Sequence, residues 1–135
     1  MTDLSAIRTA LVVETNYLIA SVIEAPLVQT GYDVLIATTP EEAFLHLAER
    51  PVHLALIDFR LQHGGPNGLV ARLQARGVPY MFCTAASTEE VVQHFPGARI
   101  VAKPFSDQEL LAAVELALAS GWAASAAPAE SGPVS

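Results

Sequence analysis

Three things are scarce in this sequence: cysteine, lysine and long uninterrupted apolar runs. The chain of 135 residues has one cysteine, Cys83, which excludes an internal disulfide and fits a reducing compartment. Charge or proline interrupts every apolar stretch well short of the roughly 20 residues that a transmembrane helix needs. The first residues lack a basic segment followed by an apolar core, so no signal peptide is expected. The sequence therefore predicts a cytoplasmic chain that does not enter a membrane.

Positive charge is also scarce, since Lys103 is the only lysine and the net charge is −7. This balance argues against a broad face that binds nucleic acid. Hydrophobic residues make up 52% of the chain, which favours a folded core over disorder. We expect one domain over residues 1–120, and a flexible tail or linker over 121–135 because Ala, Ser, Pro and Gly dominate there. Such a tail leaves open that the sequence is a piece of a longer protein.

Short apolar runs alternate along the chain with helical patterns. Five runs are typical of buried strands, at residues 10–13, 32–37, 54–57, 79–84 and 99–102. Three capping boxes mark helix starts, from Thr39 to Glu42, from Ser87 to Glu90 and from Ser106 to Glu109. Pro26 lies late in the first helical pattern, where we expect it to kink the helix or end it early. The alternation predicts an α/β fold, a doubly wound five-stranded parallel sheet with right-handed crossovers.

Polar residues lie at the carboxyl ends of four of the predicted strands: Glu14, Asp58, Thr84 and Lys103. The carboxyl ends of parallel strands share one edge of the sheet, so only the fold would bring these distant residues together. Paired carboxylates can hold Mg²⁺, and a carboxylate can also act as a nucleophile toward a phosphoryl group. The hydroxyl and the ammonium can each donate a hydrogen bond to a phosphoryl oxygen. The pattern therefore indicates a site for phosphoryl chemistry at this edge.

Several motifs occur in a recognisable order: LVVE at Leu11–Glu14, LIDFRL around Asp58, Gly68 in the following loop, Thr84-Ala85, and Lys103-Pro104-Phe105. In this order, over about residues 8–120, the chain resembles the receiver domain of bacterial two-component response regulators. The strand PYMFCT at residues 79–84 is also similar to that of short stand-alone receivers with a Pro-Phe-x-Phe-Ala-Thr strand. The resemblance implies a flavodoxin-like (βα)₅ fold in a single domain.

The resemblance also implies roles for single residues and partners. Asp58 would be the phosphoacceptor for a sensor histidine kinase in a phosphorelay, Thr84 the switch hydroxyl, and Lys103 the ammonium that contacts the phosphoryl group. Mg²⁺ would be held by Glu14, Asp58 and the backbone carbonyl of Arg60. The face formed by the fourth helix, fifth strand and fifth helix would bind a downstream protein partner, with a homodimer as a further option. Such a domain signals and is not an enzyme.

Two residues depart from the usual receiver pattern. Thr15 stands where a second acid is expected; its hydroxyl could still be a metal ligand, but this neutral oxygen should weaken Mg²⁺ binding. Glu14 or the side-chain carbonyl of Asn16 could compensate by reaching toward the metal. Ile100 occupies the place of an aromatic residue three positions before the lysine, so signalling must use another coupling. Both departures favour an alternative, a pseudo-receiver that binds proteins without being phosphorylated.

Blander interpretations remain for the same residues, because any one of them could simply end a strand or cap a turn. A hydrolase that uses Asp58 as its nucleophile is a third hypothesis, but Arg60 stands where such enzymes carry a second acid. Cys83 is expected in the core, since it lies on a buried strand. His63, in the loop after Asp58, is expected to be a solvated histidine rather than a ligand.

Overall fold

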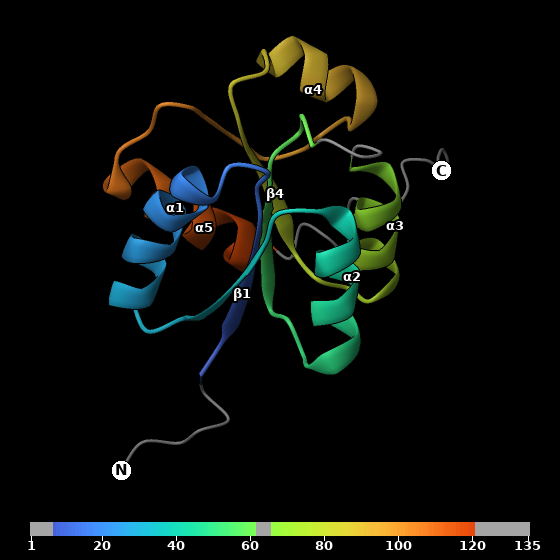
Figure 1. Cartoon of the computed structure of the whole chain (residues 1–135). Helices are drawn as coiled ribbons and strands as arrows, with labels where there is room; N and C mark the ends of the chain where they lie inside the picture. The colour runs from blue at the N-terminus through green and yellow to red at the C-terminus, as the bar shows by residue number, and fades with distance from the viewer. Residues whose placement is uncertain (1–6, 62–65, 121–135) are drawn as a thin grey trace.

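The computed structural model describes residues 7–61 and 66–120, which form a five-stranded sheet with helices on both faces (Figure 1). Every pairing is parallel, and the strand order is β2-β1-β3-β4-β5. The predicted doubly wound parallel sheet is therefore confirmed. In chain order the elements are β1 (Thr9–Val13), α1 (Tyr17–Gln29), β2 (Asp33–Ala37), α2 (Pro40–Glu49), β3 (Leu54–Ile57), α3 (Asn67–Ala75), β4 (Tyr80–Thr84), α4 (Thr88–His94), β5 (Ile100–Ala102) and α5 (Asp107–Ser120).

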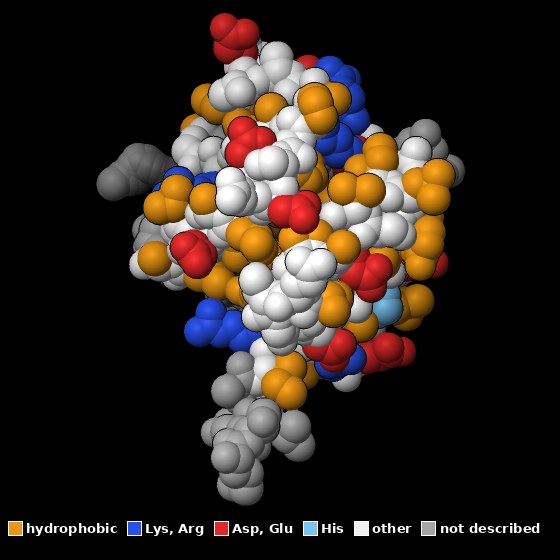
Figure 2. Space-filling model, turned by 90° about the vertical axis from the view of Figure 1, so that its left-hand side faces the viewer, with side chains coloured by type: hydrophobic (Ala, Val, Ile, Leu, Met, Phe, Trp, Pro, Cys, Tyr) orange, Lys and Arg blue, Asp and Glu red, His pale blue; other side chains and the backbone are white. Residues whose placement is uncertain are grey.

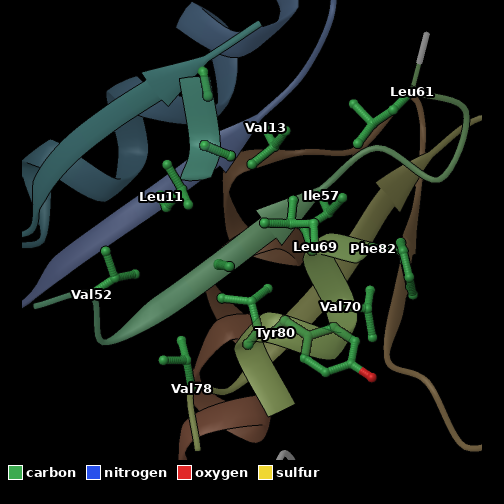
Figure 3. Packing of buried hydrophobic residues seen from close by; sticks show 14 of the residues in the cluster. Leu11, Val13, Val52, Ile57, Leu61, Leu69, Val70, Val78, Tyr80 and Phe82 are labelled. Carbon is green, nitrogen blue, oxygen red and sulfur yellow. The ribbon is translucent and has the colours of Figure 1, made fainter. Parts of the chain in front are cut away.

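The central strand β3 is buried on both faces, which explains its unbroken apolar run. Leu54 and Leu56 pack into a cluster with residues of α1 and α5. Ala55 and Ile57 point the other way, into a cluster with residues of α2, α3 and α4, part of which Figure 3 shows. Because successive side chains alternate across a strand, one short run supplies both halves of the core.

Side-chain caps fix where the helices begin. The Asn16 side-chain oxygen accepts hydrogen bonds from the N–H groups of Leu18 and Ile19, which starts α1 directly after β1. At its other end α1 continues past Pro26 to Gln29, so the expected early ending was wrong. Pro26 cannot donate a hydrogen bond to the carbonyl of Val22; Val22 is 59% exposed, whereas Pro26 itself is buried. The loss of this one hydrogen bond does not end the helix, whose later turns continue to Gln29.

Some predictions fall outside the residues that the structure describes. The tail over 121–135 and His63 are among them. Within the described ranges, no helix combines the length and the apolar character needed to cross a bilayer. Cys83 is a buried free cysteine on β4, as expected from its place on an apolar strand.

Candidate functional site

The carboxyl ends of four adjacent strands, β1, β3, β4 and β5, bring the predicted polar residues to one edge of the sheet. The ammonium nitrogen Nζ of Lys103 lies 2.5 Å from Oε1 of Glu14 and 3.3 Å from Oδ2 of Asp58. These three side chains come from strand ends that are distant in the sequence, and the parallel sheet alone joins them. The structure thus places two carboxylates around one ammonium, at the edge of the sheet where the strand pattern predicted these residues.

Glu14 is the most deeply buried acid of this group, with only 3% of the residue exposed. Its Oε1 accepts from Lys103, and its Oε2 accepts from the backbone N–H of Asn16 at 3.0 Å. The backbone N–H of Glu14 also continues the sheet by donating to the carbonyl of Ala37. A buried carboxylate is costly unless it is paired and hydrogen-bonded, and both conditions are met here. The charge of Glu14 is therefore held in a fixed position.

Asp58 follows β3 and is more accessible, with its side chain 12% exposed. Its backbone N–H donates to the carbonyl of Val13, which holds it in line with the sheet. Its Oδ1 accepts from the backbone N–H of Arg60 at 3.0 Å, while Oδ2 faces Lys103. One carboxylate oxygen is therefore anchored to the following loop, and the other lies beside the ammonium.

Lys103 is charged at neutral pH despite its partial burial. Burial by itself lowers the pKa of the ammonium, but the hydrogen bond with Glu14 and the charges of Asp58 and Glu14 outweigh it, so the pKa of Lys103 is raised. The backbone N–H of Lys103 donates to the carbonyl of Thr84 at 3.0 Å. The ends of β4 and β5 are thus tied together beside the acids.

Thr84 is fully buried at the end of β4, one strand away from Asp58 in the sheet order. Its hydroxyl oxygen accepts a hydrogen bond from the backbone N–H of Ala86 at 3.2 Å. Its carbonyl accepts from Lys103, so Thr84 joins the cluster through its backbone. In this structure the hydroxyl is therefore engaged with the loop that leads from β4 into α4.

The oxygen atoms near Asp58 suit a hard cation such as Mg²⁺. Glu14, Asp58 and Lys103 together carry a charge of −1, which leaves one carboxylate charge uncompensated. No group of three or more His, Cys, Asp or Glu side chains in the described ranges is placed to hold a metal ion. The side-chain carbonyl of Asn16 caps α1 in this structure, which makes it a poor substitute for the acid that Thr15 replaces. The donor set fits a metal bound by two carboxylates and few other protein atoms.

A family model described as the response regulator receiver domain matches residues 10–115. The chain belongs to this family. Receivers are signalling modules rather than classical enzymes, and they generally bind Mg²⁺ at the phosphorylation site. They interact with histidine kinases and with downstream partners. A comparison with curated proteins gave no match.

Solved receiver structures share this fold. A receiver domain from Leptospira biflexa, the non-phosphorylated HemR domain, is 28% identical, with a TM-score of 0.71 over 82% of this chain and 94% of that one. The signal receiver domain of an HD domain-containing protein from Pseudomonas fluorescens Pf-5 is 24% identical, with a TM-score of 0.76 over 85% and 97%. A CheY-like receiver from Methanospirillum hungatei JF-1 is 23% identical, with a TM-score of 0.75 over 86% and 97%.

Two features of this receiver site were not predicted from the sequence. The guanidinium of Arg60 forms an ion pair with Glu90, with Nη2 of Arg60 2.6 Å from Oε1 of Glu90. The ring of Phe59 packs edge-on against two other rings: its centroid lies 5.8 Å from that of Phe82 and 6.1 Å from that of Phe95. The only sequence signal for either was the position of Phe59 and Arg60 directly after Asp58. Both contacts link the loop after β3 to the region of α4.

An apolar hollow of about 430 Å³ borders the receiver site. Figure 2 turns the left-hand side of Figure 1, where α1 lies, toward the viewer and shows hydrophobic side chains exposed on that face. Leu18 and Val22 of α1 are 76% and 59% exposed. The hollow lies between the exposed apolar face of α1 and the ammonium of Lys103. Its lining consists of Ile19, Val22, Ala85, Lys103, Pro104 and Phe105.

Proposed function

We propose that this receiver accepts a phosphoryl group from a sensor histidine kinase on Asp58 and signals through protein–protein contact. The observation that carries the proposal is the contact of the Lys103 ammonium with both Asp58 and the buried Glu14. An ammonium held in this place stabilises negative charge on a phosphoryl group that arrives at Asp58. Thr84 would be the switch hydroxyl. It would give up its hydrogen bond with the backbone N–H of Ala86 and donate to a phosphoryl oxygen instead.

The reaction follows from the arrangement of the side chains. A carboxylate oxygen of Asp58 attacks phosphorus, and the bond between phosphorus and the donor breaks. When the donor is a phosphohistidine, the imidazole nitrogen keeps the electron pair of the broken bond. The product is an acyl phosphate on Asp58, next to Lys103. No proton transfer at Asp58 is needed, because the carboxylate reacts in its ionised form.

Mg²⁺ would be held by Glu14, Asp58 and the backbone carbonyl of Arg60. When bound, the metal offsets the charge of the transferring phosphoryl group. We propose weak binding, because Thr15 supplies a neutral oxygen where a second charged ligand is usual. Both oxygens of Glu14 already accept hydrogen bonds, so a metal must share this carboxylate with Lys103 and the backbone.

The kinase would dock on the apolar hollow beside α1. A phosphohistidine must reach Asp58, and this hollow is an apolar surface lined in part by the site residue Lys103. Exposed Leu18 and Val22 extend the same surface along α1. Apolar groups of this size are typical of the buried centre of a protein–protein interface. The cytoplasm, where the single cysteine stays reduced, is the compartment we propose for this encounter.

The output would pass through the face formed by α4, β5 and α5 to a downstream protein or to a second copy of the chain. Ile100 lies on this face and packs, partly buried, against the core cluster that contains Phe82. An aliphatic side chain cannot act as a swinging aromatic reporter, so another group must carry the signal to α4. No part of this proposal involves nucleic acid or a membrane.

The test is incubation of the chain with acetyl phosphate and Mg²⁺, followed by measurement of the intact mass. A phosphoryl adduct should form on the native chain and be absent from Asp58→Ala. Acetate leaves with the electron pair of the broken bond, so the mass gain is that of one phosphoryl group. Absence of an adduct on the native chain would contradict the proposal.

The second candidate is a pseudo-receiver that binds its partner without phosphorylation. Thr15 and Ile100 favour it, because each removes a part that phosphorylated receivers usually have. It predicts no adduct in the same experiment, together with equal partner binding by the native chain and Asp58→Ala. The two candidates therefore give opposite results.

A further inference from the structure

An ion pair spans the edge of the site between the loop after β3 and the first turn of α4. It joins the guanidinium of Arg60 to the carboxylate of Glu90 at 2.6 Å, and the two side chains are 59% and 36% exposed. The backbone N–H of Arg60 donates to Oδ1 of Asp58, so this cation is attached directly beside the phosphoacceptor. An exposed ion pair of this kind contributes little to stability, so its members can exchange partners.

The backbone of the loop is less free than the guanidinium. Phe59 contacts the rings of Phe82 and Phe95, and its centroid lies 5.5 Å from that of His94 at the end of α4. These contacts hold the residue between Asp58 and Arg60 against the core. When the charge at Asp58 changes, we therefore expect the long side chain of Arg60 to move and the backbone of the loop to stay in place.

Glu90 differs from the equivalent glutamates of the other capped helices. Glu109 closes its capping box by accepting from the backbone N–H of Ser106 at 2.8 Å, and Glu42 accepts from the N–H of Thr38 at 2.7 Å. At α4 the hydroxyl of Ser87 accepts from the N–H of Glu90, which forms half of the box. The other half is missing because the Glu90 carboxylate binds Arg60 instead. The backbone N–H of Ser87, which a reciprocal capping box would pair with Glu90, is thus the alternative partner that we infer for this carboxylate.

We propose that Arg60 is a phosphoryl-binding residue and that phosphorylation transfers its guanidinium from Glu90 to the phosphoryl group. Glu90 then closes the capping box on the backbone N–H of Ser87 and reorganises the first turn of α4. This exchange rests on the proposed function, because it requires the acyl phosphate on Asp58. It also supplies the coupling to α4 that Ile100 cannot provide.

The charges at the site favour the exchange. Phosphorylation replaces the single charge of Asp58 with a phosphoryl group of about −1.5 to −2 and three strong acceptor oxygens. Lys103, the only lysine, is already held by Glu14 at 2.5 Å. A guanidinium forms bidentate hydrogen bonds with a phosphoryl group, and these are stronger than its exposed pair with one carboxylate. Glu90 loses little, because the Ser87 N–H replaces its lost partner.

The first test compares beryllofluoride binding, at saturating Mg²⁺, between the native chain and Glu90→Gln. Glutamine can still close the capping box, but it no longer competes for Arg60, so beryllofluoride affinity should rise about two- to fivefold. Glu89→Gln is the matched control, because Glu89 is exposed in the same helical turn and loses the same helix-dipole interaction. Its affinity should equal that of the native chain. Arg60→Gln keeps the backbone carbonyl and should weaken binding about tenfold.

The second test follows the backbone amide of Ser87 by NMR. Beryllofluoride should shift the Ser87 amide proton downfield in the native chain, because that amide gains a carboxylate acceptor. The shift should be lost in Glu90→Ala, which has no acceptor, and retained in Glu89→Ala. An unmoved Ser87 amide in the native chain, or equal affinities for Glu90→Gln and Glu89→Gln, would overturn the exchange.

Failure of the exchange differs from failure of the proposed function. If acetyl phosphate labels Asp58 while the variants of Arg60 and Glu90 behave like the native chain, only the exchange is wrong. If the native chain neither binds beryllofluoride nor forms an adduct at Asp58, both proposals are wrong.

Discussion

Lys103 supplies the only ammonium of the site, and two acids depend on it. Its ammonium contacts Glu14, of which 3% is exposed, and also Asp58. A buried carboxylate that loses its partner is far more costly than an exposed one. The same side chain therefore serves the stability of the fold and the proposed chemistry.

Replacing this ammonium should destabilise the protein. Lys103→Met keeps the length of the side chain but leaves Glu14 buried without its cation, and we expect a loss of about 3 kcal/mol in the free energy of unfolding. Urea denaturation at pH 7 measures it. Arg50→Met is the matched control, because Arg50 and Asp33 form a pair whose side chains are 42% and 49% exposed. That variant should lose no more than about 1 kcal/mol, and equal losses in the two variants would contradict the role of burial.

A second prediction at this scale concerns Thr15. Thr15→Asp adds a charged oxygen ligand beside Glu14, and we expect Mg²⁺ binding to tighten about tenfold or more. Calorimetric titration of Mg²⁺ into the native chain and the variant measures the change. Thr15→Asn, which adds a neutral oxygen on a side chain of the same length, is the control. Native binding already as tight as that of Thr15→Asp would refute the proposed weakness.

At the scale of single elements, most starts and ends were predictable because their causes are local. The cap by Asn16 and the half-box of Ser87 with Glu90 follow from short-range hydrogen bonds that the sequence displays. The early ending expected at Pro26 was wrong, since α1 continues to Gln29 with Pro26 on its buried face. The ion pair of Glu90 with Arg60 was not predicted, because the two residues lie 30 positions apart in the sequence.

The exposed face of α1 gives a prediction for this element. Val22 lines the apolar hollow beside Lys103, so Val22→Arg should slow phosphotransfer from a histidine kinase that labels the native chain by about tenfold. Labelling by acetyl phosphate should be unchanged, because the small donor needs no docking surface. Val28→Arg is the control, since Val28 is 51% exposed on the same helix and does not line the hollow. An equal effect of the two variants would contradict docking at the hollow.

At the scale of the whole molecule, three groups with raised pKa values make the fold sensitive to alkali: Cys83, Lys103 and Tyr80, whose pKa is raised by burial. Burial raises the pKa of the Cys83 thiol to about 12, against a weaker lowering influence of Lys103. The pKa of Lys103 is also raised, because the acids of the site outweigh burial. A group whose folded pKa is raised holds its proton more tightly when folded, so stability is lost as pH increases.

We therefore expect the free energy of unfolding to fall above about pH 8.5, where an unfolded thiol begins to ionise. The thiol of Cys83 should account for about 2 kcal/mol between pH 7 and pH 10, at about 1.4 kcal/mol for each pH unit above its unfolded pKa. The contribution of Lys103 to the free energy of unfolding is retained to about pH 10.4, and it is lost as pH rises through the higher pKa of the folded state. Urea denaturation at about pH 7, 8.5, 10 and 11 measures the slope on both sides of these unfolded pKa values.

Cys83→Ala separates the contribution of the thiol from those of Lys103 and Tyr80. It should flatten the decline between pH 8.5 and 10 and leave the decline at higher pH. A thiol reagent provides an independent check, because Cys83 should be inert at pH 8 in the native protein and react fully in guanidinium. Rapid reaction of the native thiol would contradict its burial.

The sequence by itself determined the alternation of strands and helices and the polar residues that end four of the strands. Periodicity and capping are local properties, so they can be read without coordinates. Only the tertiary structure decided which side chains meet: that Lys103 is shared by Glu14 and Asp58, and that Arg60 binds Glu90. These contacts join residues 30 to 89 positions apart, and the order of strands in the sheet brings them within reach.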